Sequence, residues 1–269
     1  MNDANSLSDR AVIRLAGEDR FSFLQGLITQ NADRLNREPA IFAALLTPQG
    51  KILFDFFVAP APDAFFIDCS AATAPALLKR LALYKLRAKV SLEIDETLCV
   101  RTDANELKDG LAYADPRHAE MGWRAIVRDG DAAADGAYDR RRIALGVPEA
   151  NKDFAGDEIF LTDANYDALD GVSYKKGCFI GQEVSSRMKR KGEIRRRTLI
   201  AEFDGPAPAK GAPVIAGATT LGEIMSSSGR AALALIRLDR WEKAQAQGKT
   251  AECEDQPLRL RIPDYLEQV

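Results

Sequence analysis

The sequence predicts an α+β protein with mostly antiparallel strands, followed by a small antiparallel β-barrel. Helical and strand-like segments alternate through the first two thirds of the chain. A tight hairpin lies among them, and hairpins join antiparallel neighbours. The last third consists of short apolar segments separated by Gly, Pro and Ser, a pattern typical of small barrels. We therefore expect an α+β domain over residues 1–195 and a barrel over 196–269.

The first domain opens with an amphipathic helix and a hairpin. Apolar residues recur at helical spacing at Phe21, Leu24, Leu27 and Ile28. Two apolar runs then flank the sequence TPQG at 47–50, where the Pro and the Gly occupy the second and fourth positions of a type I turn. Farther along, we expect a strand at 64–70, a helix within 74–90, one strand over 90–102, another from Gly122, and a helix from about Tyr138 that ends at Gly146.

Composition excludes several classes of protein. The chain has 269 residues with a formal net charge of -3, so it is not a globally basic nucleic-acid binder. The N-terminal residues lack a signal-peptide pattern, and no apolar run is long enough to span a bilayer. From these features we expect a cytoplasmic protein with no membrane partner.

The four cysteines are widely spaced, at 69, 99, 178 and 253, and form no CxxC pair. A structural zinc site and a disulfide framework are therefore not expected. Cys69 and Cys99 lie in apolar strand patterns, which indicates buried thiols. The single histidine, His118, lies in a polar segment, where a solvated loop position outweighs a catalytic role.

Cys178 has a different context, because it follows Lys175 and Lys176 and precedes a helical pattern that begins near Gly181. The free N–H groups at a helix start and the adjacent lysines favour a thiolate. The alternative is a small buried hydrophobic residue. A dense basic run follows at Arg187, Lys189, Arg190, Lys191, Arg195, Arg196 and Arg197. It is either a solvated turn or a site for an anionic ligand tail, and the lack of interleaved aromatic residues argues against nucleic acid.

The segment KKGCFIGQE resembles the K-G-C-[FY]-x-G-Q-E signature of the folate-binding YgfZ-type proteins, which include factors that help mature [4Fe-4S] enzymes. It matches at Lys176, Gly177, Cys178, Phe179, Gly181, Gln182 and Glu183. Other segments are similar to the family in the same order, namely FLQGLITQN, LLTPQGKILFD, DPRHAEMGWR, RRIALGVPE and LTDANYDALDGVSYKKG. The resemblance runs from about Phe21 to Arg197, with a weaker barrel-like tail.

This family shares its fold with the T-protein of the glycine cleavage system, a tetrahydrofolate-dependent aminomethyltransferase. The resemblance implies a folate-binding domain with the pterin in a central channel, followed by a small barrel. Asp55 stands where T-proteins carry their catalytic aspartate, whereas Ala144 replaces a pterin-binding glutamate. T-proteins generally lack a cysteine at the place of Cys178. The residues implied in folate binding are Asp55, Asn165, Tyr166, Lys176, Gln182, Glu183 and Arg187.

The resemblance implies an accessory protein for assembly or repair of [4Fe-4S] enzymes, which binds tetrahydrofolate or a one-carbon derivative and acts through Cys178. Its expected partners are an assembly scaffold or client proteins, and Cys178 is a possible shared cluster ligand. The alternatives are a folate-dependent aminomethyl transferase using Asp55, and a role in tRNA modification, because a related folate domain occurs in a tRNA-modifying GTPase. No phosphate-loop motif is present, which argues against a GTPase.

Overall fold

A computed structural model describes residues 5–128, 136–191 and 194–267 of the chain. Its first sheet contains five antiparallel strands in the order β3-β4-β5-β2-β6. These are β2 (Arg10–Ala16), β3 (Ile41–Leu46), β4 (Ile52–Pro60), β5 (Ala64–Ser70) and β6 (Ser91–Ile94). β3 and β4 form the predicted hairpin, because Gly50 N donates to Thr47 O at 2.9 Å across the TPQG turn.

A second antiparallel sheet has the order β1-β7-β9-β8. Its strands are β1 (Asn5–Ser6), β7 (Cys99–Asp103), β8 (Leu111–Ala114) and β9 (Trp123–Val127). The expectation of one continuous strand over 90–102 is wrong, because β6 and β7 belong to different sheets. The break lies at Asp95, whose side chain accepts hydrogen bonds from Thr97 and whose carbonyl accepts from Leu98 N.

Short helices flank these sheets, and α2 (Ala74–Lys85) packs on the first sheet through its contacts with β2 and β6. Pro75 opens α2, and Leu77 and Leu81 form its buried face. The other helical elements are α1 (Arg20–Gln25), α3 (Ala137–Ala144), α4 (Gln182–Lys191) and α5 (Leu238–Ala246), with 3-10 turns η1 (Ala32–Asn36), η2 (Ala119–Met121) and η3 (Asp264–Leu266). No described helix is long and apolar enough to cross a membrane.

The C-terminal strands close into a six-stranded antiparallel barrel, in the order β10-β13-β12-β11-β14-β15. They are β10 (Arg196–Phe203), β11 (Pro213–Ala216), β12 (Thr219–Ser228), β13 (Ala231–Arg237), β14 (Ala251–Cys253) and β15 (Gln256–Arg261). Closure comes from pairing of the first strand with the last, β10 with β15. The predicted α+β class with antiparallel sheets and a terminal barrel is confirmed.

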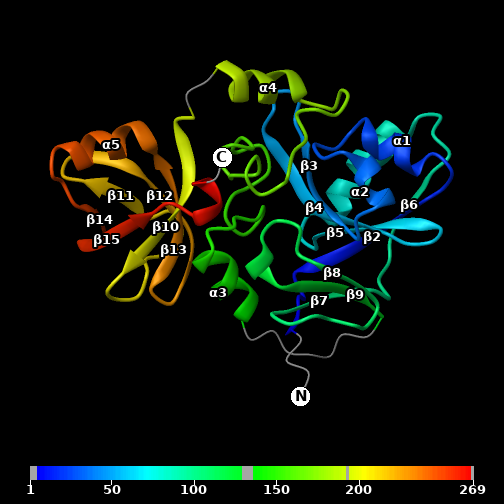
Figure 1. The fold of residues 1–269 in the computed structure, drawn as a ribbon, viewed down its shortest axis with the longest axis horizontal. Helices are drawn as coiled ribbons and strands as arrows, with labels where there is room; N and C mark the ends of the chain where they lie inside the picture. The colour runs from blue at the N-terminus through cyan, green and yellow to red at the C-terminus, as the bar shows by residue number, and fades with distance from the viewer. Residues whose placement is uncertain (1–4, 129–135, 192–193, 268–269) are drawn as a thin grey trace.

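Between α3 and α4 the chain runs through residues 145–181 without a regular helix or strand, and we call this segment the central loop. Figure 1 shows it in green between the barrel on one side and the two sheets on the other. Four of its non-glycine residues have positive φ, namely Asn151, Asp157, Asn165 and Asp170. Its apolar side chains belong to one core with β3, β4 and the barrel strands β10 and β13. Long irregular segments of this kind are usually functional.

Candidate functional site

Asp55 lies in the middle of β4 and is buried. Its Oδ2 accepts hydrogen bonds from Ala150 N at 2.9 Å and from the Tyr166 hydroxyl, both in the central loop. Its Oδ1 is buried and has no hydrogen-bond partner within the described structure. Burial raises the pKa of Asp55, and the nearby charge of Glu149 raises it further. One carboxyl oxygen of Asp55 is therefore held by the central loop, while the other makes no hydrogen bond within the described residues.

The surroundings of Asp55 are filled by a buried ionic cluster, which we define as Arg10, Asp68, Asp115, Arg117, Arg124, Tyr138 and Glu149. Arg10 bridges two carboxylates, with Nε 2.6 Å from Asp68 Oδ1 and Nη1 2.9 Å from Glu149 Oε1. Arg124 reaches the other oxygen of Asp68 at 2.6 Å. The side chains of these ion pairs are at most 2% exposed.

The cluster continues through Arg117, which donates to Asp115 at 2.7 Å and to the Tyr138 hydroxyl at 2.8 Å. That hydroxyl in turn donates to Glu149. The guanidinium groups of Arg117 and Arg124 lie 4.6 and 4.1 Å from the centre of the Phe57 ring. Burial opposes ionisation of Glu149, but the charges of Arg10 and Arg117 outweigh it and lower its pKa. The surroundings of Glu149 therefore favour its ionised form, whereas those of Asp55 favour its protonated form.

Glu149 is a buried carboxylate whose Oε1 accepts from Arg10 and whose Oε2 accepts from Tyr138. Ala144 is exposed at the end of α3, where its carbonyl accepts from Arg261 at 3.1 Å. Sequence reasoning missed Glu149 and its arginine partners. A usable signal exists, since Asp55, Asp68 and Arg124 each interrupt an apolar strand run, and a charge in such a position needs a buried partner.

Asn165, expected near the ligand, also joins the central loop to the barrel. It is buried, and its Nδ2 donates to Thr198 O at 2.8 Å and to the Tyr265 hydroxyl at 3.0 Å. Its Oδ1 is buried without a partner among the described residues. Asn165 therefore fixes the loop while keeping one free acceptor, and its neighbour Tyr166 is the residue that contacts Asp55.

Cys178 is exposed near the end of the central loop, four residues before α4. The flanking Lys176 is buried, and its Nζ donates to Ile28 O at 2.7 Å and to Gln30 O at 2.9 Å. Burial lowers the pKa of Lys176 to about 8. We call residues 175–181, at the end of the central loop, the cysteine loop. Lys176 ties this loop to the segment after α1, where the motif FLQGLITQN supplies the two accepting carbonyls. Lys175 is exposed.

The hydrogen bonds of Lys176 are one brace of the cysteine loop. A second brace, formed by two glycines, holds its other side. Gly181 has φ +76°, and a Cβ there would lie 2.5 Å from Thr47 O. Gly50 in the hairpin turn has φ +83°, and a Cβ there would lie 3.0 Å from Val184 Cβ at the start of α4. Only glycine allows this backbone conformation and this approach at no steric cost. The hairpin turn with the motif PQGK and the segment with the motif GCFIGQE therefore pack directly against each other.

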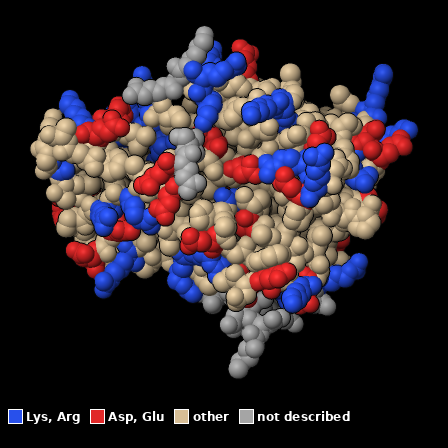
Figure 2. Space-filling view, in the orientation of Figure 1, with Lys and Arg blue, Asp and Glu red and all other residues tan. Residues whose placement is uncertain are grey.

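The remaining predicted residues lie on α4, with Gln182 partly buried and with Glu183 and Arg187 exposed. Lys and Arg side chains gather at the top of Figure 2, where α4 lies in Figure 1. Lys189 Nζ is 3.5 Å from Asp167, while Arg187 makes no ion pair within the described residues. Beside α4 lies a cavity of about 200 Å³ lined by Phe160, Thr162, Asp163, Met188, Ile194, Arg195 and Arg196.

The other thiols are less accessible. Cys69 is buried in β5, and burial raises its pKa to about 12. Cys253, which lies in a polar stretch of sequence, is nevertheless buried in β14, and burial raises its pKa. Across residues 5–128, 136–191 and 194–267, no group of three or more His, Cys, Asp or Glu is placed to hold a metal. The predicted set therefore divides into a buried centre at Asp55 and Tyr166 and a surface site at Cys178 and α4.

Comparison with known proteins identifies the family. Residues 195–268 match the family described as CAF17, C-terminal beta-barrel domain. The chain is 30% identical over 302 residues to the protein of Mus musculus named iron-sulfur cluster assembly factor IBA57, mitochondrial, covering 96% of this chain and 84% of the mouse protein. The chain belongs to the IBA57 family. The human protein of the same name is 29% identical, with the same coverage.

The fold extends beyond the IBA57 family. The crystal structure of the glycine cleavage system aminomethyltransferase T from Bartonella henselae superposes with a TM-score of 0.77. It covers 98% of this chain and 86% of that one at 16% identity, so it establishes the shared fold alone. The resemblance to YgfZ-type proteins and to the T-protein fold is confirmed.

The expectation of a cytoplasmic protein is wrong. The mouse, human and Neurospora crassa members of the IBA57 family are mitochondrial by name. The physical reason for the error is that composition and scattered thiols indicate only a reducing aqueous compartment, and more than one compartment meets that description.

Proposed function

We propose that this IBA57-family chain binds tetrahydrofolate and serves assembly or repair of [4Fe-4S] enzymes through Cys178. Its relatives, named as iron-sulfur cluster assembly factors, support the assembly role. The observation that carries the residue assignment is the exposed thiol of Cys178 on a loop braced on both sides, by Lys176 and by Gly181. A braced loop presents a reactive group at low entropic cost to a partner protein.

A cluster at Cys178 would be cargo shared with another protein. Iron–sulfur clusters are held by several ligands, normally cysteine thiolates. Among the described residues, no group of three or more His, Cys, Asp or Glu could hold a metal at Cys178 or elsewhere. The scaffold or client protein would therefore supply the remaining ligands, and the exposure of Cys178 leaves room for such a partner.

For the folate, the free Oδ1 atoms of Asp55 and Asn165 are buried acceptors that suit N–H donors of a pterin. We expect anaerobic titration calorimetry to detect tetrahydrofolate binding, and Asp55→Asn to weaken it about tenfold or more, because the amide presents one acceptor instead of two. The control is Asp63→Asn, an exposed aspartate on the turn before β5. No binding by the wild-type chain at millimolar folate would overturn the folate assignment.

The exposed cations of α4 suit the anionic tail of a polyglutamylated folate. We expect the polyglutamate form to bind more tightly than the monoglutamate, with a difference that shrinks as salt rises. Arg187→Gln should reduce that difference and leave monoglutamate binding unchanged. Equal affinities of both forms at low salt would instead identify the basic run as a solvated turn.

Complementation of a deletion strain tests the whole assignment. We expect wild type to restore [4Fe-4S] enzyme activity and Cys178→Ser to fail, with glycine cleavage intact in both strains. The reverse pattern, with loss of aminomethyl transfer in Asp55→Asn and full activity of Cys178→Ser, would establish the transferase alternative.

A further inference from the structure

The C-terminal end of α2 carries a surface that the proposed function does not use. We define the α2 patch as Lys79, Arg80, Leu83, Lys85, Leu86 and Arg87, all of which are exposed. Leu83 is 62% and Leu86 is 90% exposed. The next most exposed large apolar side chain in the described part of the chain is Ile262, at 39%. Adjacent exposed apolar groups rimmed by polar residues are a feature of protein or membrane interaction sites.

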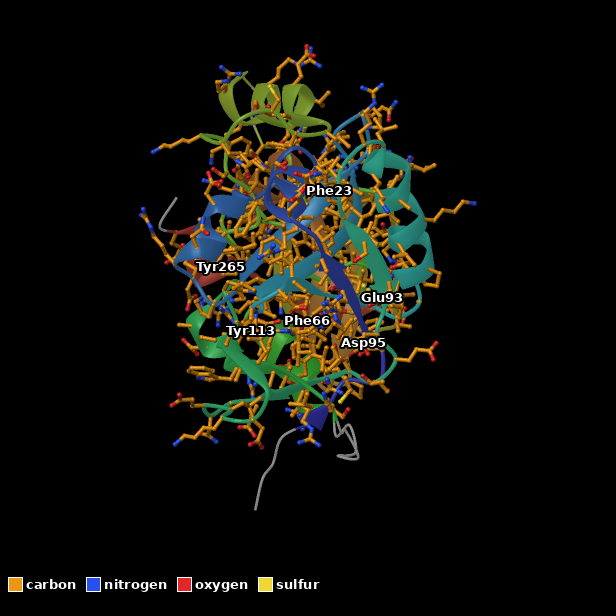
Figure 3. The ribbon with its side chains drawn as sticks, turned by 90° about the vertical axis from the view of Figure 1, so that its right-hand side faces the viewer. Phe23, Phe66, Glu93, Asp95, Tyr113 and Tyr265 are labelled. Carbon is orange, nitrogen blue, oxygen red and sulfur yellow. The ribbon has the colours of Figure 1, made fainter. Side chains whose placement is uncertain are left out.

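Charge singles out the same surface. No acidic residue occurs between Asp68 and Glu93, although the chain as a whole has a net charge of -3. Within the described residues, the patch cations Lys79, Arg80, Lys85 and Arg87 make no ion pair. Figure 3 faces this side of the molecule and shows nitrogen-tipped side chains projecting outward from α2. The patch therefore combines unneutralised cations with protruding apolar groups.

The backbone at Leu86 supplies an independent observation. Leu86 follows the last helical residue with φ 39° and ψ -103°, a conformation that side chains other than glycine rarely adopt. Packing does not explain the choice of leucine, because its side chain is almost fully exposed. Strained backbone of this kind clusters at functional sites, which makes Leu86 a candidate interaction residue.

We propose that the α2 patch docks on an anionic lipid surface, with Leu83 and Leu86 entering the headgroup region and the four cations meeting lipid phosphates. Aliphatic side chains next to Lys and Arg are the composition of interfacial attachment sites. The leucines protrude rather than line a groove, which suits a soft lipid interface better than an acidic helix that needs a groove to fill. Such attachment needs no spanning helix, and no described helix could span a membrane.

Vesicle co-sedimentation of the full chain tests this proposal, with phosphatidylcholine vesicles compared with vesicles that also contain phosphatidylglycerol. We expect binding to the anionic vesicles alone, falling as salt rises. The double variant Leu83→Ser, Leu86→Ser should lose at least about tenfold in binding. Lys79→Gln with Arg80→Gln should weaken binding by roughly thirtyfold, because both cations contribute to the attraction of the anionic surface.

Matched controls distinguish binding through the α2 patch from nonspecific adsorption to vesicles. Ile262→Ser changes the third exposed apolar residue, and Arg187→Gln with Arg190→Gln changes the cations of α4; both should bind like wild type. Leu86→Gly removes the side chain and relieves the backbone, so it should melt at an equal or higher temperature while binding vesicles less. Wild-type binding by the double leucine variant would overturn the proposal. So would binding of a soluble acidic peptide in place of the anionic vesicles, which would identify a protein-docking site.

Discussion

The ionic cluster and the cysteine loop are built on opposite principles. In the cluster, Asp68 and Glu149 are buried with every charge matched by an arginine at 2.6–2.9 Å. In the loop, the thiol of Cys178 is exposed, and its neighbours Lys176 and Gly181 make the structural contacts. The cluster joins strands far apart in the chain, whereas the loop presents a group outward. Paired buried charges and an exposed thiol thus lie in different parts of the molecule.

The energetic contrast follows from desolvation. A buried ion pair contributes little net stability when intact, because both charges have left water, yet removal of one partner leaves an uncompensated buried charge. An exposed side chain has water as its alternative partner, so its removal costs little. Substitutions in the two regions should therefore differ by several kcal/mol in the free energy of unfolding.

The largest effect is expected for Asp68→Ala, which leaves the buried Arg10 and Arg124 without their shared carboxylate. We expect the free energy of unfolding in urea to fall by about 3–5 kcal/mol. The control is Asp63→Ala, which removes a 74% exposed partner of Arg14 and should cost about 1 kcal/mol or less. Similar losses in the two variants would show that the buried ionic cluster contributes no more to stability than an exposed ion pair does.

These partnerships also mark the limit of sequence-based prediction. The hairpin at 47–50 was predictable because Pro and Gly occupy defined turn positions, and the barrel was predictable from its short strands. The pairing of Arg10 with Asp68 spans 58 residues, and no local spacing signals it. Asp55 was singled out through the family resemblance, and Cys178 first through its lysine neighbours and the helix predicted after it. The contacts that hold the loop around Cys178 join motifs more than 100 residues apart, so no local pattern predicts them.

Two glycines of the motif GCFIGQE, Gly181 and Gly177, differ in the space around them and are expected to give the next largest difference in stability. In Gly181→Ala, the new Cβ would lie 2.5 Å from Thr47 O, and φ would remain at +76°. We expect a loss of about 1–3 kcal/mol in the free energy of unfolding. Gly177→Ala is the matched control, since nothing lies within 4 Å of its Cβ position. A neutral Gly181→Ala would contradict the packing of the hairpin turn against α4.

Lys176→Met tests the other brace, with Lys175→Met as the exposed control. Loss of the ammonium leaves two carbonyls without their donor, while burial of a charge is relieved, so the net destabilisation should be about 1 kcal/mol. The alkylation rate of Cys178 should rise as the loop loosens. An unchanged rate would mean that Lys176 does not position the cysteine.

The pH dependence of the same variant has a definite sign. Burial lowers the pKa of Lys176 to about 8 from an ordinary 10.5, so between these values the unfolded state holds more protons than the folded state. The contribution of Lys176 to the free energy of unfolding therefore rises with pH over that interval. We expect wild type to gain stability relative to Lys176→Met between pH 8 and 10.5, measured by paired urea titrations. A difference that stays constant with pH would show that Lys176 ionises as it does in water.

The smallest effect on stability should come from Cys178→Ser, although this change should remove function. The thiol is exposed, and the adjacent Gly177 leaves open space, so we expect a change within about 0.5 kcal/mol. In the wild-type chain, a limiting alkylating reagent should label Cys178 first, because burial restricts access to Cys69 and Cys253 and raises the pKa of both thiols. Peptide mapping reports the order of labelling, and complementation reports function. Labelling of Cys69 first would contradict the predicted order of thiol reactivity. Full [4Fe-4S] enzyme activity of Cys178→Ser would show that the Cys178 thiol is not required for function.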